Sequence, residues 1–529
     1  MTVDLYARSR FWAIHLTERP SVTGTEDEAS FGPWLAEELQ SNPVFGGAEV
    51  WTIPVAKGDP RHCVAMFLRG TGPQTVLLTG HFDTVTTQDY GDLRDLAIKP
   101  VELLRALRLR LDRTAKTPAE ILAKADFSGD DFLPGRGLLD MKAGLAAGLA
   151  VAEQFAATSA PRGNLLFIAV PDEENASAGA RAAAQRLADI AAERQISIVA
   201  AINLDAIADN GDGSAGRAIA TGTVGKVLPT AFVVGVPTHS GFPLNGINAA
   251  VILAAIVAQV EWSADLTDSF SGQKGTPPSL LSLRDGKSGY DVTTPASAFA
   301  TWNVIFYRRT PAEILTAFDS LCQTAIADVL DRLGARAGDG IGLPSVPIIR
   351  FSEVLECAKR LEPAILVRLA DQADASLPLP ERCRRATETV WAASGLAGPA
   401  VVTGFGSIPY LSTALTESDQ GGALKHALQA AAKSAGAPVA VSDYFAGISD
   451  MSFFGEADPA SLSIVAANTP LWETAVCWPD ANLPAGIPTI NIGPWGRDYH
   501  TPLERMHVGY AFDVLPKLLN DVVLRVVSA

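Results

Sequence analysis

Long apolar runs, basic clusters and secretion signals are scarce in this sequence of 529 residues. No apolar run reaches the roughly 18 residues of a membrane span, and the richest, residues 249–258, ends at a glutamine and is typical of a buried helix. Acidic residues outnumber basic ones by 58 to 42, and the net charge of −16 argues against nucleic acid as a partner. Residues 1–14 contain Asp4, Arg8 and Arg10 and lack the apolar core of a signal peptide. We therefore expect neither a membrane nor a nucleic acid as a partner.

Cysteine is also scarce. An odd number of cysteines, none of them in a CxxC motif, favours buried, reduced thiols and a cytoplasmic location. The five cysteines are Cys63, Cys322, Cys357, Cys383 and Cys477.

The composition describes a folded chain of more than one domain. An apolar fraction of 48% and a charged fraction of 19% are typical of globular proteins. The length exceeds what one ordinary hydrophobic core occupies, so two or more domains are predicted. We find no internal repeat and no low-complexity tract.

The N-terminal part alternates short β-rich runs with helical stretches. The runs at 75–78, 165–170 and 198–204 each end beside a polar cluster, and helices are predicted at 142–155 and 178–193. This alternation predicts an α/β fold in which helices cover a mixed, mostly parallel sheet on both sides. Because functional groups gather beyond the carboxyl ends of strands in such sheets, the polar residues after these runs are candidates for an active site.

The pattern changes near Ala218. Strands are predicted at 230–236 and 298–307, and helices at 248–260 and 311–333, which indicates a separate α+β module.

Sequence typical of the first part returns after this module. A Gly- and Pro-rich linker near 335–347 precedes helical sequence at 353–393, then short strands at 401–403 and 488–492 and a final helix from Val508. We therefore expect the first and last parts of the chain to fold together around the module. The predicted division is 1–216 and 346–529 for the main domain, with a helical insertion near 353–398, and 217–345 for the module.

Four short segments contain histidines and carboxylates suited to divalent metal ions. Such ligands suit zinc and related ions, and two ions about 3.5–4 Å apart can activate water and polarise a carbonyl together. The segments are GHFDTV at 80–85, GRGLLDMK at 135–142, PDEE at 171–174 and DYHT at 498–501.

Each candidate has a plainer interpretation when it is taken alone. His81 alone would be a loop histidine beside a solvated Asp83, and Asp140 alone would be a helix N-cap. Glu173 and Glu174 would form a solvated acidic turn. Asp205 would be a turn or cap residue, and His500 a surface histidine. Adjacent carboxylates repel each other, however, so an acidic turn is costly to pack unless a cation is near. The order and spacing of the whole set favour a metal site.

Taken together, the segments resemble the M20 family of zinc aminoacylases and carboxypeptidases, which includes glutamate carboxypeptidase, succinyl-diaminopimelate desuccinylase and acetylornithine deacetylase. The resemblance runs from PSVTGTEDE at 20–28 to the terminal histidine, in the order HxD, GRGxxDMKxG, DEE, Asp, lid His and His. It implies a catalytic α/β domain with an inserted, ferredoxin-like lid domain.

The resemblance also implies a role for each candidate. The implied cofactor is a pair of Zn²⁺ ions, with Co²⁺ or Mn²⁺ as alternatives. His81 and Asp205 would bind one ion, Glu174 and His500 the other, and Asp140 both; Glu173 would be the general base and then the general acid, and Asp83 would orient His81.

Further matches concern the substrate. His239, in GVPTHSGFP at 235–243, resembles a lid histidine that stabilises an oxyanion, and Arg308 resembles a lid arginine that holds a substrate carboxylate. Asn248, Gly447 and Ser449 are implied as further substrate contacts.

Two stretches depart from the family pattern. They are residues 87–131, which include a basic amphipathic helical segment at 103–113, and residues 345–399. Both make the chain similar to the arginine-utilisation branch of the family. They can reshape the pocket mouth, cover the usual dimer surface or bind a partner, so they leave the substrate and the oligomeric state open.

The expected function is a dinuclear zinc-dependent amidohydrolase or peptidase that cleaves an amide bond of a small N-acyl amino acid or dipeptide. A small amide or peptide substrate and a homodimer through the lid are the expected partners. The alternative is a non-catalytic binding protein on the same scaffold, which is less favoured because no ligand and no base is missing. A nucleotide-binding enzyme is weaker still, since no GxGxxG or GxxxxGK[ST] follows a strand.

Overall fold

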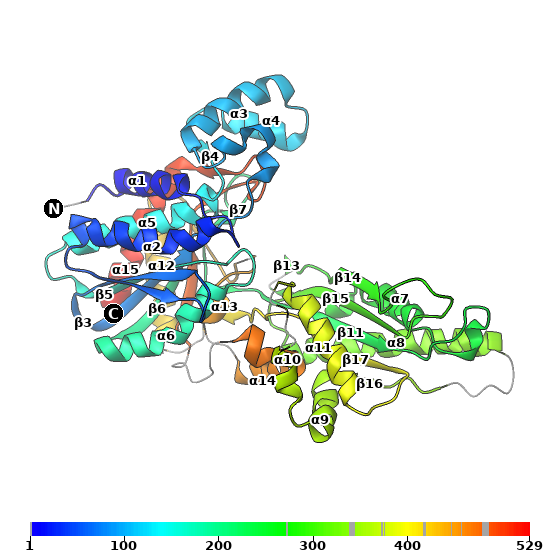
Figure 1. Ribbon diagram of the computed structural model, residues 1–529. Coiled ribbons are helices and arrows are strands. Elements are labelled where there is room, and N and C mark those ends of the chain that lie inside the picture. The colour runs from blue at the N-terminus through cyan, green and yellow to red at the C-terminus, as the bar shows by residue number, and fades with distance from the viewer. Residues whose placement is uncertain are drawn as a thin grey trace. The chain divides into compact units, whose positions relative to one another are not determined.

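The computed structural model describes residues 3–528, except for 271–272, 338–343, 372–373, 375, 416–418, 446, 456–457 and 479–485. The chain divides into two compact units, which are described separately (Figure 1). Unit 1 comprises Met1–Thr223, Thr413–Glu456 and Pro479–Ala529, and unit 2 comprises Val224–Ser412 and Ala457–Trp478.

A large mixed sheet forms the centre of unit 1. Its strand order is β1-β2-β5-β3-β6-β20-β8-β19, and the neighbours β5, β3, β6 and β20 are parallel. The mostly parallel sheet that the strand pattern predicts is therefore present. The strands are β1 (Glu49–Pro54), β2 (His62–Leu68), β3 (Thr71–His81), β5 (Arg162–Val170), β6 (Ser197–Asn203), β8 (Ala218–Ala220), β19 (Ala440–Ser442) and β20 (Thr489–Ile492).

Helices cover both faces of this sheet (Figure 1). Along β5, Leu165, Phe167 and Ala169 join the core beneath α5 and α15, whereas the alternating residues Leu166 and Ile168 point to the face that α6 covers. The helices are α1 (Leu5–Glu18), α2 (Glu26–Ser41), α5 (Ala143–Ala157), α12 (Asp419–Ser434) and α15 (Leu515–Ser528) on the first side, and α6 (Ala178–Arg194) and α13 (Met451–Phe454) on the second.

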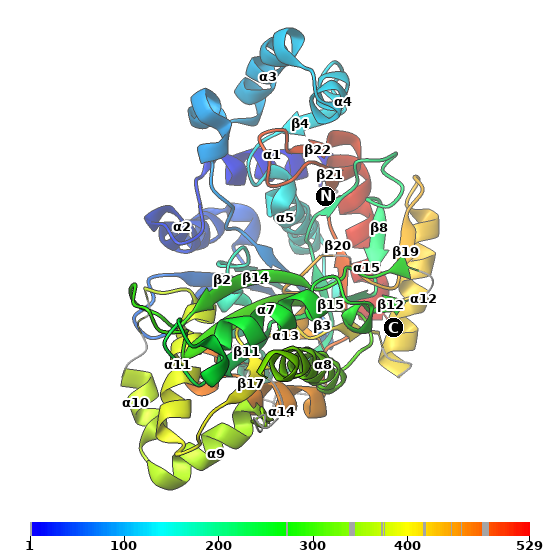
Figure 2. The same cartoon turned by 90° about the vertical axis from the view of Figure 1, so that its right-hand side faces the viewer.

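The first unusual stretch of sequence forms a helical insertion within unit 1. It consists of η2 (Gln88–Leu96), α3 (Pro100–Thr114) and α4 (Pro118–Asp126), and α3 buries leucines at four-residue spacing. It leads into a small sheet of order β4-β22-β21-β7. Figure 2 shows β4, β22 and β21 of this sheet near α4. These strands are β4 (Phe132–Pro134), β7 (Ile207–Ala208), β21 (Trp495–Arg497) and β22 (Arg505–His507).

Unit 2 is built on a β-α-β-β-α-β order. The elements are β11 (Pro229–Val234), α7 (Ala249–Val260), β14 (Ser279–Asp285), β15 (Ser297–Phe306), α8 (Pro311–Ala337) and β17 (Ala400–Phe405). The strands lie in the order β14-β15-β11-β17, with β10 (Gly225–Val227) on β15 and β16 (Ile348–Arg350) on β17. This is the expected ferredoxin-like topology, and α7 and α8 share one core with its sheet.

The predicted boundary of the module at residue 345 is wrong. Helices α9 (Phe351–Leu361), α10 (Ile365–Asp371) and α11 (Leu379–Ala393) pack on the second face of the unit 2 sheet through Phe232 and Phe299. Strand β17, expected in the main domain, pairs with β11 in the middle of the unit 2 sheet. Helix α14 (Pro459–Asn468) also belongs to unit 2. The sequence pattern identified these elements but contains no information about which sheet they pack against.

Candidate metal centre

Three neighbouring parallel strands bring the candidate ligands to one edge of the unit 1 sheet. His81 is the last residue of β3, and its register partner on β5 is Val170, just before the Asp172–Glu174 turn. On the other side, Thr79 of β3 pairs with Asn203, the last residue of β6, so Asp205 follows at the same edge. As predicted, these residues follow the carboxyl ends of neighbouring parallel strands.

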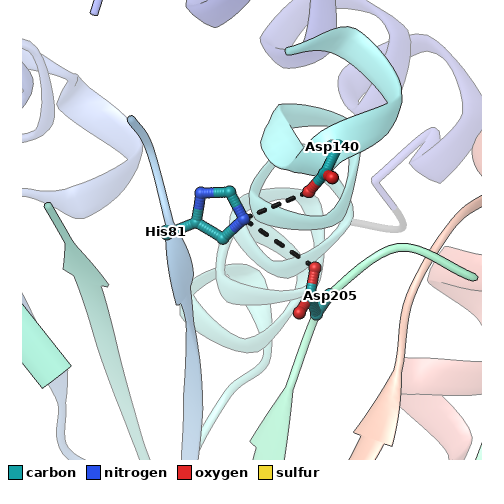
Figure 3. A group of neighbouring side chains, drawn as sticks. All are labelled: His81, Asp140 and Asp205. Atoms are coloured by element: carbon teal, nitrogen blue, oxygen red, sulfur yellow. Dashed lines mark hydrogen bonds and ion pairs between the residues drawn. The ribbon is translucent and has the colours of Figure 1, made fainter. Parts of the chain in front are cut away.

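His81, Asp140 and Asp205 form the first cluster of candidate ligands (Figure 3). The Nε2 atom of His81 lies 3.1 Å from Asp140 Oδ1 and 3.8 Å from Asp205 Oδ1. His81 is buried, and its Nδ1 atom lies 3.0 Å from the carbonyl oxygen of Asp83, which leaves Nε2 facing the carboxylates.

Asp140, Glu174 and His500 form the second cluster. The Nε2 atom of His500 lies 3.2 Å from Asp140 Oδ2 and 3.1 Å from Glu174 Oε1. Asp140 thus faces one histidine with each of its two oxygens, which is the arrangement that a bridging carboxylate requires.

The loop that carries Asp140 is tightly packed. Gly137 has a φ of 73°, and a Cβ atom there would lie 2.3 Å from Thr84 Cγ2 on the His81 segment. Both the backbone conformation and the close approach require glycine at this position. Helix α5 begins at Ala143, so Asp140 precedes the helix rather than capping it.

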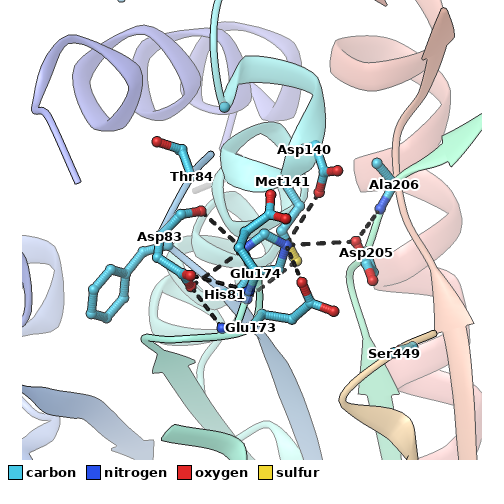
Figure 4. A network of polar contacts seen from close by, with 12 residues as sticks. His81, Asp83, Thr84, Asp140, Met141, Glu173, Glu174, Asp205, Ala206 and Ser449 are labelled. Atoms are coloured by element: carbon cyan, nitrogen blue, oxygen red, sulfur yellow. Dashed lines mark hydrogen bonds and ion pairs between the residues drawn. The ribbon is translucent and has the colours of Figure 1, made fainter. Parts of the chain in front are cut away.

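Asp83 contacts both His81 and the acidic turn (Figure 4). Its Oδ1 atom lies 3.6 Å from His81 Nδ1 and accepts a hydrogen bond from the backbone N–H of Glu173 at 3.1 Å. Its Oδ2 atom accepts from the N–H of Glu174 at 3.2 Å and from the Thr23 hydroxyl at 2.8 Å. The carboxylate therefore fixes the turn relative to the His81 strand.

Glu173 points toward the space beside His81, with Oε2 3.9 Å from His81 Nε2. Burial raises its pKa well above the ordinary range for glutamate, and the neighbouring carboxylates of Asp205 and Glu174 add to this shift. A glutamate that readily holds a proton and does not belong to either cluster is suited to proton transfer.

The electrostatics of both histidines reflect an excess of negative charge. Burial lowers the pKa of His500, but its hydrogen bonds to Asp140 and Glu174 outweigh this and raise it to about 10. His81 behaves alike, because its contacts with Asp140 and Asp205 raise its pKa despite burial. The same charge excess favours cations in this space.

The donor set fits a pair of divalent ions. Both clusters consist of imidazole nitrogens and carboxylate oxygens, and in each the ligand atoms lie within 4.8 Å of one another. Nitrogen and oxygen donors of this kind suit Zn²⁺, and also Co²⁺ or Mn²⁺.

The expected lid residues belong to unit 2, whereas the candidate metal ligands belong to unit 1. His239 is exposed, and its Nδ1 accepts a hydrogen bond from the N–H of Gly241 at 3.0 Å. The Arg308 guanidinium lies 4.1 Å from the centre of the Phe270 ring, and Asn248 caps α7 through the N–H of Ala250. Their roles toward a substrate stay predictions.

The expected substrate loop of unit 1 has partners within the protein. Ser449 is fully buried, and its hydroxyl accepts hydrogen bonds from Asn203 Nδ2 at 2.9 Å and from the N–H of Met451 at 3.3 Å. The carbonyl of Gly447 accepts from the Thr223 hydroxyl at 3.4 Å. Any contact of these two residues with a substrate stays a prediction.

Sequence reasoning gave no role to two buried polar residues of the site, of which Asn491 holds a ligand residue in place. Asn491 of β20 accepts a hydrogen bond from the N–H of Asp205 at 3.1 Å and donates to its carbonyl at 2.8 Å. Asp450 is a further buried carboxylate at this site, and burial raises its pKa to about 7. Both residues lie inside segments that the sequence identified, Asn491 in the predicted strand 488–492 and Asp450 at the end of residues 447–450, but neither was given a role at the metal centre.

Among the helices that the structure describes, none combines the length and the apolar character that crossing a bilayer requires.

A family model described as Peptidase family M20/M25/M40 matches residues 117–480, which include Asp140, Glu173, Glu174 and Asp205 but neither His81 nor His500.

Two Bacillus subtilis proteins are similar over nearly the whole chain. The uncharacterized protein YqjN is 29% identical, covering 96% of this chain and 94% of its own length. Protein RocB is 28% identical, with 97% and 94% covered. The similarity to RocB agrees with the branch of the family that the two insertions indicated.

Solved structures share the fold. A tripeptidase from Staphylococcus aureus has a TM-score of 0.52 at 15% identity, with 100% of both chains covered. Human carnosine dipeptidase 1 also has a TM-score of 0.52, at 12% identity and with 99% and 97% covered. The expected fold class and family are thus confirmed. The chain belongs to peptidase family M20/M25/M40 and is a hydrolase of peptide bonds.

Proposed function

We propose that the protein uses two divalent metal ions, most simply Zn²⁺, to hydrolyse an amide bond of a small N-acyl amino acid or dipeptide. The observation that carries the proposal is the position of Asp140, whose two oxygens lie 3.1 Å from His81 Nε2 and 3.2 Å from His500 Nε2. A carboxylate shared between two ligand groups in this way is suited to a dinuclear centre.

Five residues would hold the ions. His81 and Asp205 would serve one ion, Glu174 and His500 the other, and Asp140 both. When bound, such a pair lowers the pKa of water toward neutrality and polarises the amide carbonyl.

Glu173 would move the proton. Its Oε2 atom would accept a proton from the attacking water and later donate it to the leaving amine nitrogen. Its buried position and its raised pKa support this role, because a carboxyl group that holds a proton more readily than an ordinary glutamate is suited to donate it again.

Residues of unit 2 would bind the rest of the substrate. His239 would donate a hydrogen bond to the developing oxyanion, and Arg308 would pair with a substrate carboxylate, with Asn248 as a further contact. The exposed position of the His239 side chain supports this role. Gly447 and Ser449 would flank the substrate from unit 1.

The proposal includes a homodimer formed through unit 2 and a cytoplasmic location. Strand β14 lies at the edge of the unit 2 sheet and exposes Leu281 and Leu283, a surface that favours pairing with another chain. The five cysteines all lie in described parts of the chain and form no disulfide bond, as expected of a reducing compartment.

The deciding experiment is a hydrolysis panel. Chelator-stripped protein is reloaded with Zn²⁺ and incubated with N-acyl amino acids, N-carbamoyl amino acids and dipeptides, and the released amine is measured. We expect turnover of at least one class, loss of turnover with chelator, and recovery with Zn²⁺. A protein that binds zinc but hydrolyses no compound of the panel would instead support the alternative, a non-catalytic binding protein.

A further inference from the structure

The loop that presents His500 connects two adjacent antiparallel strands of unit 1. Strand β21 ends at Arg497 and β22 begins at Arg505, and these two arginines are direct register partners. The loop between them, residues 498–504, therefore starts and ends at a pair of positive charges. Like charges in directly opposed positions of a sheet repel each other and destabilise the pairing.

One carboxylate from the helical insertion binds both arginines. Asp126, the last residue of α4, has both oxygens 2.7 Å from Arg497 Nη1, and its Oδ2 lies 2.6 Å from Arg505 Nε. The side chains are largely buried, with 11% of Asp126, 10% of Arg497 and none of Arg505 exposed. Charge-assisted hydrogen bonds in such a setting are among the stronger contacts in a protein.

Arg505 transmits this contact into the loop. Its Nη1 atom lies 2.7 Å from Asp498 Oδ2 and donates to the carbonyl of Leu503 at 2.9 Å. Asp498 and His500 both have a positive φ, of 53° and 63°. Backbone conformations of this kind are unfavourable for residues other than glycine and persist only when surrounding contacts hold them.

We propose that Asp126 is a positioning residue that holds the His500 loop in its ligand conformation, so that the second ligand cluster depends on the insertion. The inference rests on one part of the proposed function, which is that the two clusters bind metal ions; it does not require hydrolysis. It assigns to residues 87–131 a specific task, which is to supply the carboxylate that neutralises the base of this loop.

The first cluster is held by other contacts. His81 belongs to the central sheet, and Asp205 is fixed by Asn491 through two hydrogen bonds. None of the described contacts of these residues involves Asp126. Loss of the Asp126 carboxylate should therefore weaken the second site and spare the first.

The test is a zinc titration of the chelator-stripped, full-length protein. Parent, Asp126→Asn and Asp130→Asn are each titrated with Zn²⁺ by calorimetry, and retained zinc is measured by elemental analysis after dialysis. Asp130 is the matched control, because it lies in the same insertion and pairs with Arg108, but its side chain is fully exposed. We expect Asp126→Asn to bind the second ion about 10–100-fold more weakly, as is typical when a residue supporting a metal ligand is lost. Binding of the first ion should be unchanged, and Asp130→Asn should match the parent.

Parent-like binding of both ions by folded Asp126→Asn would overturn the inference, as would equal weakening at both sites. If Asp126→Asn does not fold, Asp126→Ser decides, since it also removes the carboxylate but leaves a smaller polar side chain. Weaker binding of the second ion by Asp126→Ser supports the inference, and parent-like binding overturns it. The hydrolysis panel is read separately: a parent that binds two ions without turnover overturns the proposed function and leaves this inference standing.

Discussion

Arg136 and Glu504 form a buried ion pair in which Arg136 Nη1 lies 2.6 Å from Glu504 Oε2, and each side chain is 1% exposed. The other oxygen of Glu504 accepts a hydrogen bond from the N–H of Gly137 at 3.0 Å. The pair joins the turn before Asp140 to the segment after His500, although 368 residues separate the partners. It thus connects two ligand-bearing segments from opposite ends of the chain.

Breaking this pair should destabilise unit 1. Glu504→Gln leaves Arg136 buried with Asp89 as its remaining carboxylate partner, at 2.6 Å. Removing one member of a buried pair costs about 3–5 kcal/mol, so we expect a loss near the lower end, about 3 kcal/mol, in chemical denaturation of the metal-free protein. Asp513→Asn, which breaks the exposed pair with Lys517, should cost less than about 1 kcal/mol. Equal effects of the two substitutions would contradict the structural importance of the buried pair.

Glu173→Gln should separate metal binding from catalysis. The substitution keeps the shape of the side chain and removes the carboxylate that would accept the proton, and Glu173 belongs to neither ligand cluster. We expect zinc content equal to that of the parent and a fall in kcat of roughly 10²–10⁴-fold. Unchanged kcat on a substrate of the parent would exclude Glu173 as the base.

His81→Ala and His500→Ala should each remove one ligand and lower the zinc content. His81 is buried, whereas 42% of the His500 side chain is exposed, so the His500 site should lose its ion more readily on dialysis. Elemental analysis across a series of chelator concentrations checks this order. Retention of the full zinc content by either variant would remove that histidine from the ligand set.

The pH dependence of stability should include a contribution from Glu28. Burial raises the pKa of Glu28 to about 7, and one of its oxygens lies 3.6 Å from Arg61 without a hydrogen bond in the described structure. Between its ordinary pKa and about 7, the folded state binds more protons at this group than the unfolded state does. Its contribution to stability is therefore full at low pH and is lost as the pH rises through about 7.

Glu28→Gln should reduce this loss. The melting temperature of the chelated parent should fall more between pH 5 and pH 8 than that of the variant; the pH range is chosen to span the shift. Glu26→Gln, an exposed position in the same helix, serves as the control. A parent and a Glu28→Gln variant with the same pH profile would show that Glu28 is ionised in the folded protein throughout.

Much of the unit 1 fold and of the candidate metal centre could be predicted from the sequence, for a physical reason. Buried parallel strands appear as short β-rich runs, and the polar residues that follow them, such as His81 and Asp205, must lie at one edge of the sheet. The assignment of β17 and of α9–α11 to a unit could not be predicted, because apolar periodicity reveals a buried face but not its partner.

The supporting contacts of the site also escaped prediction. Asp126 and Arg505 are 379 residues apart, and each alone is typical of a solvated surface residue. Charged pairs of this kind follow from the tertiary structure and have no local pattern. Asp83 was expected only to orient His81, and its second task, binding the N–H groups of the acidic turn, depends on how β3 and β5 lie side by side.

The path of the chain between the two units has a consequence for synthesis. Unit 2 takes residues 224–412 and then, after a return to unit 1, residues 457–478, which include α14. Val465 of that helix belongs to the same hydrophobic core as Val401 and Phe405 of β17. When all of β17 has left the ribosome, the nascent chain still lacks this part of the core. Unit 2 therefore cannot complete its packing during synthesis until the intervening unit 1 segment and then α14 have also been made.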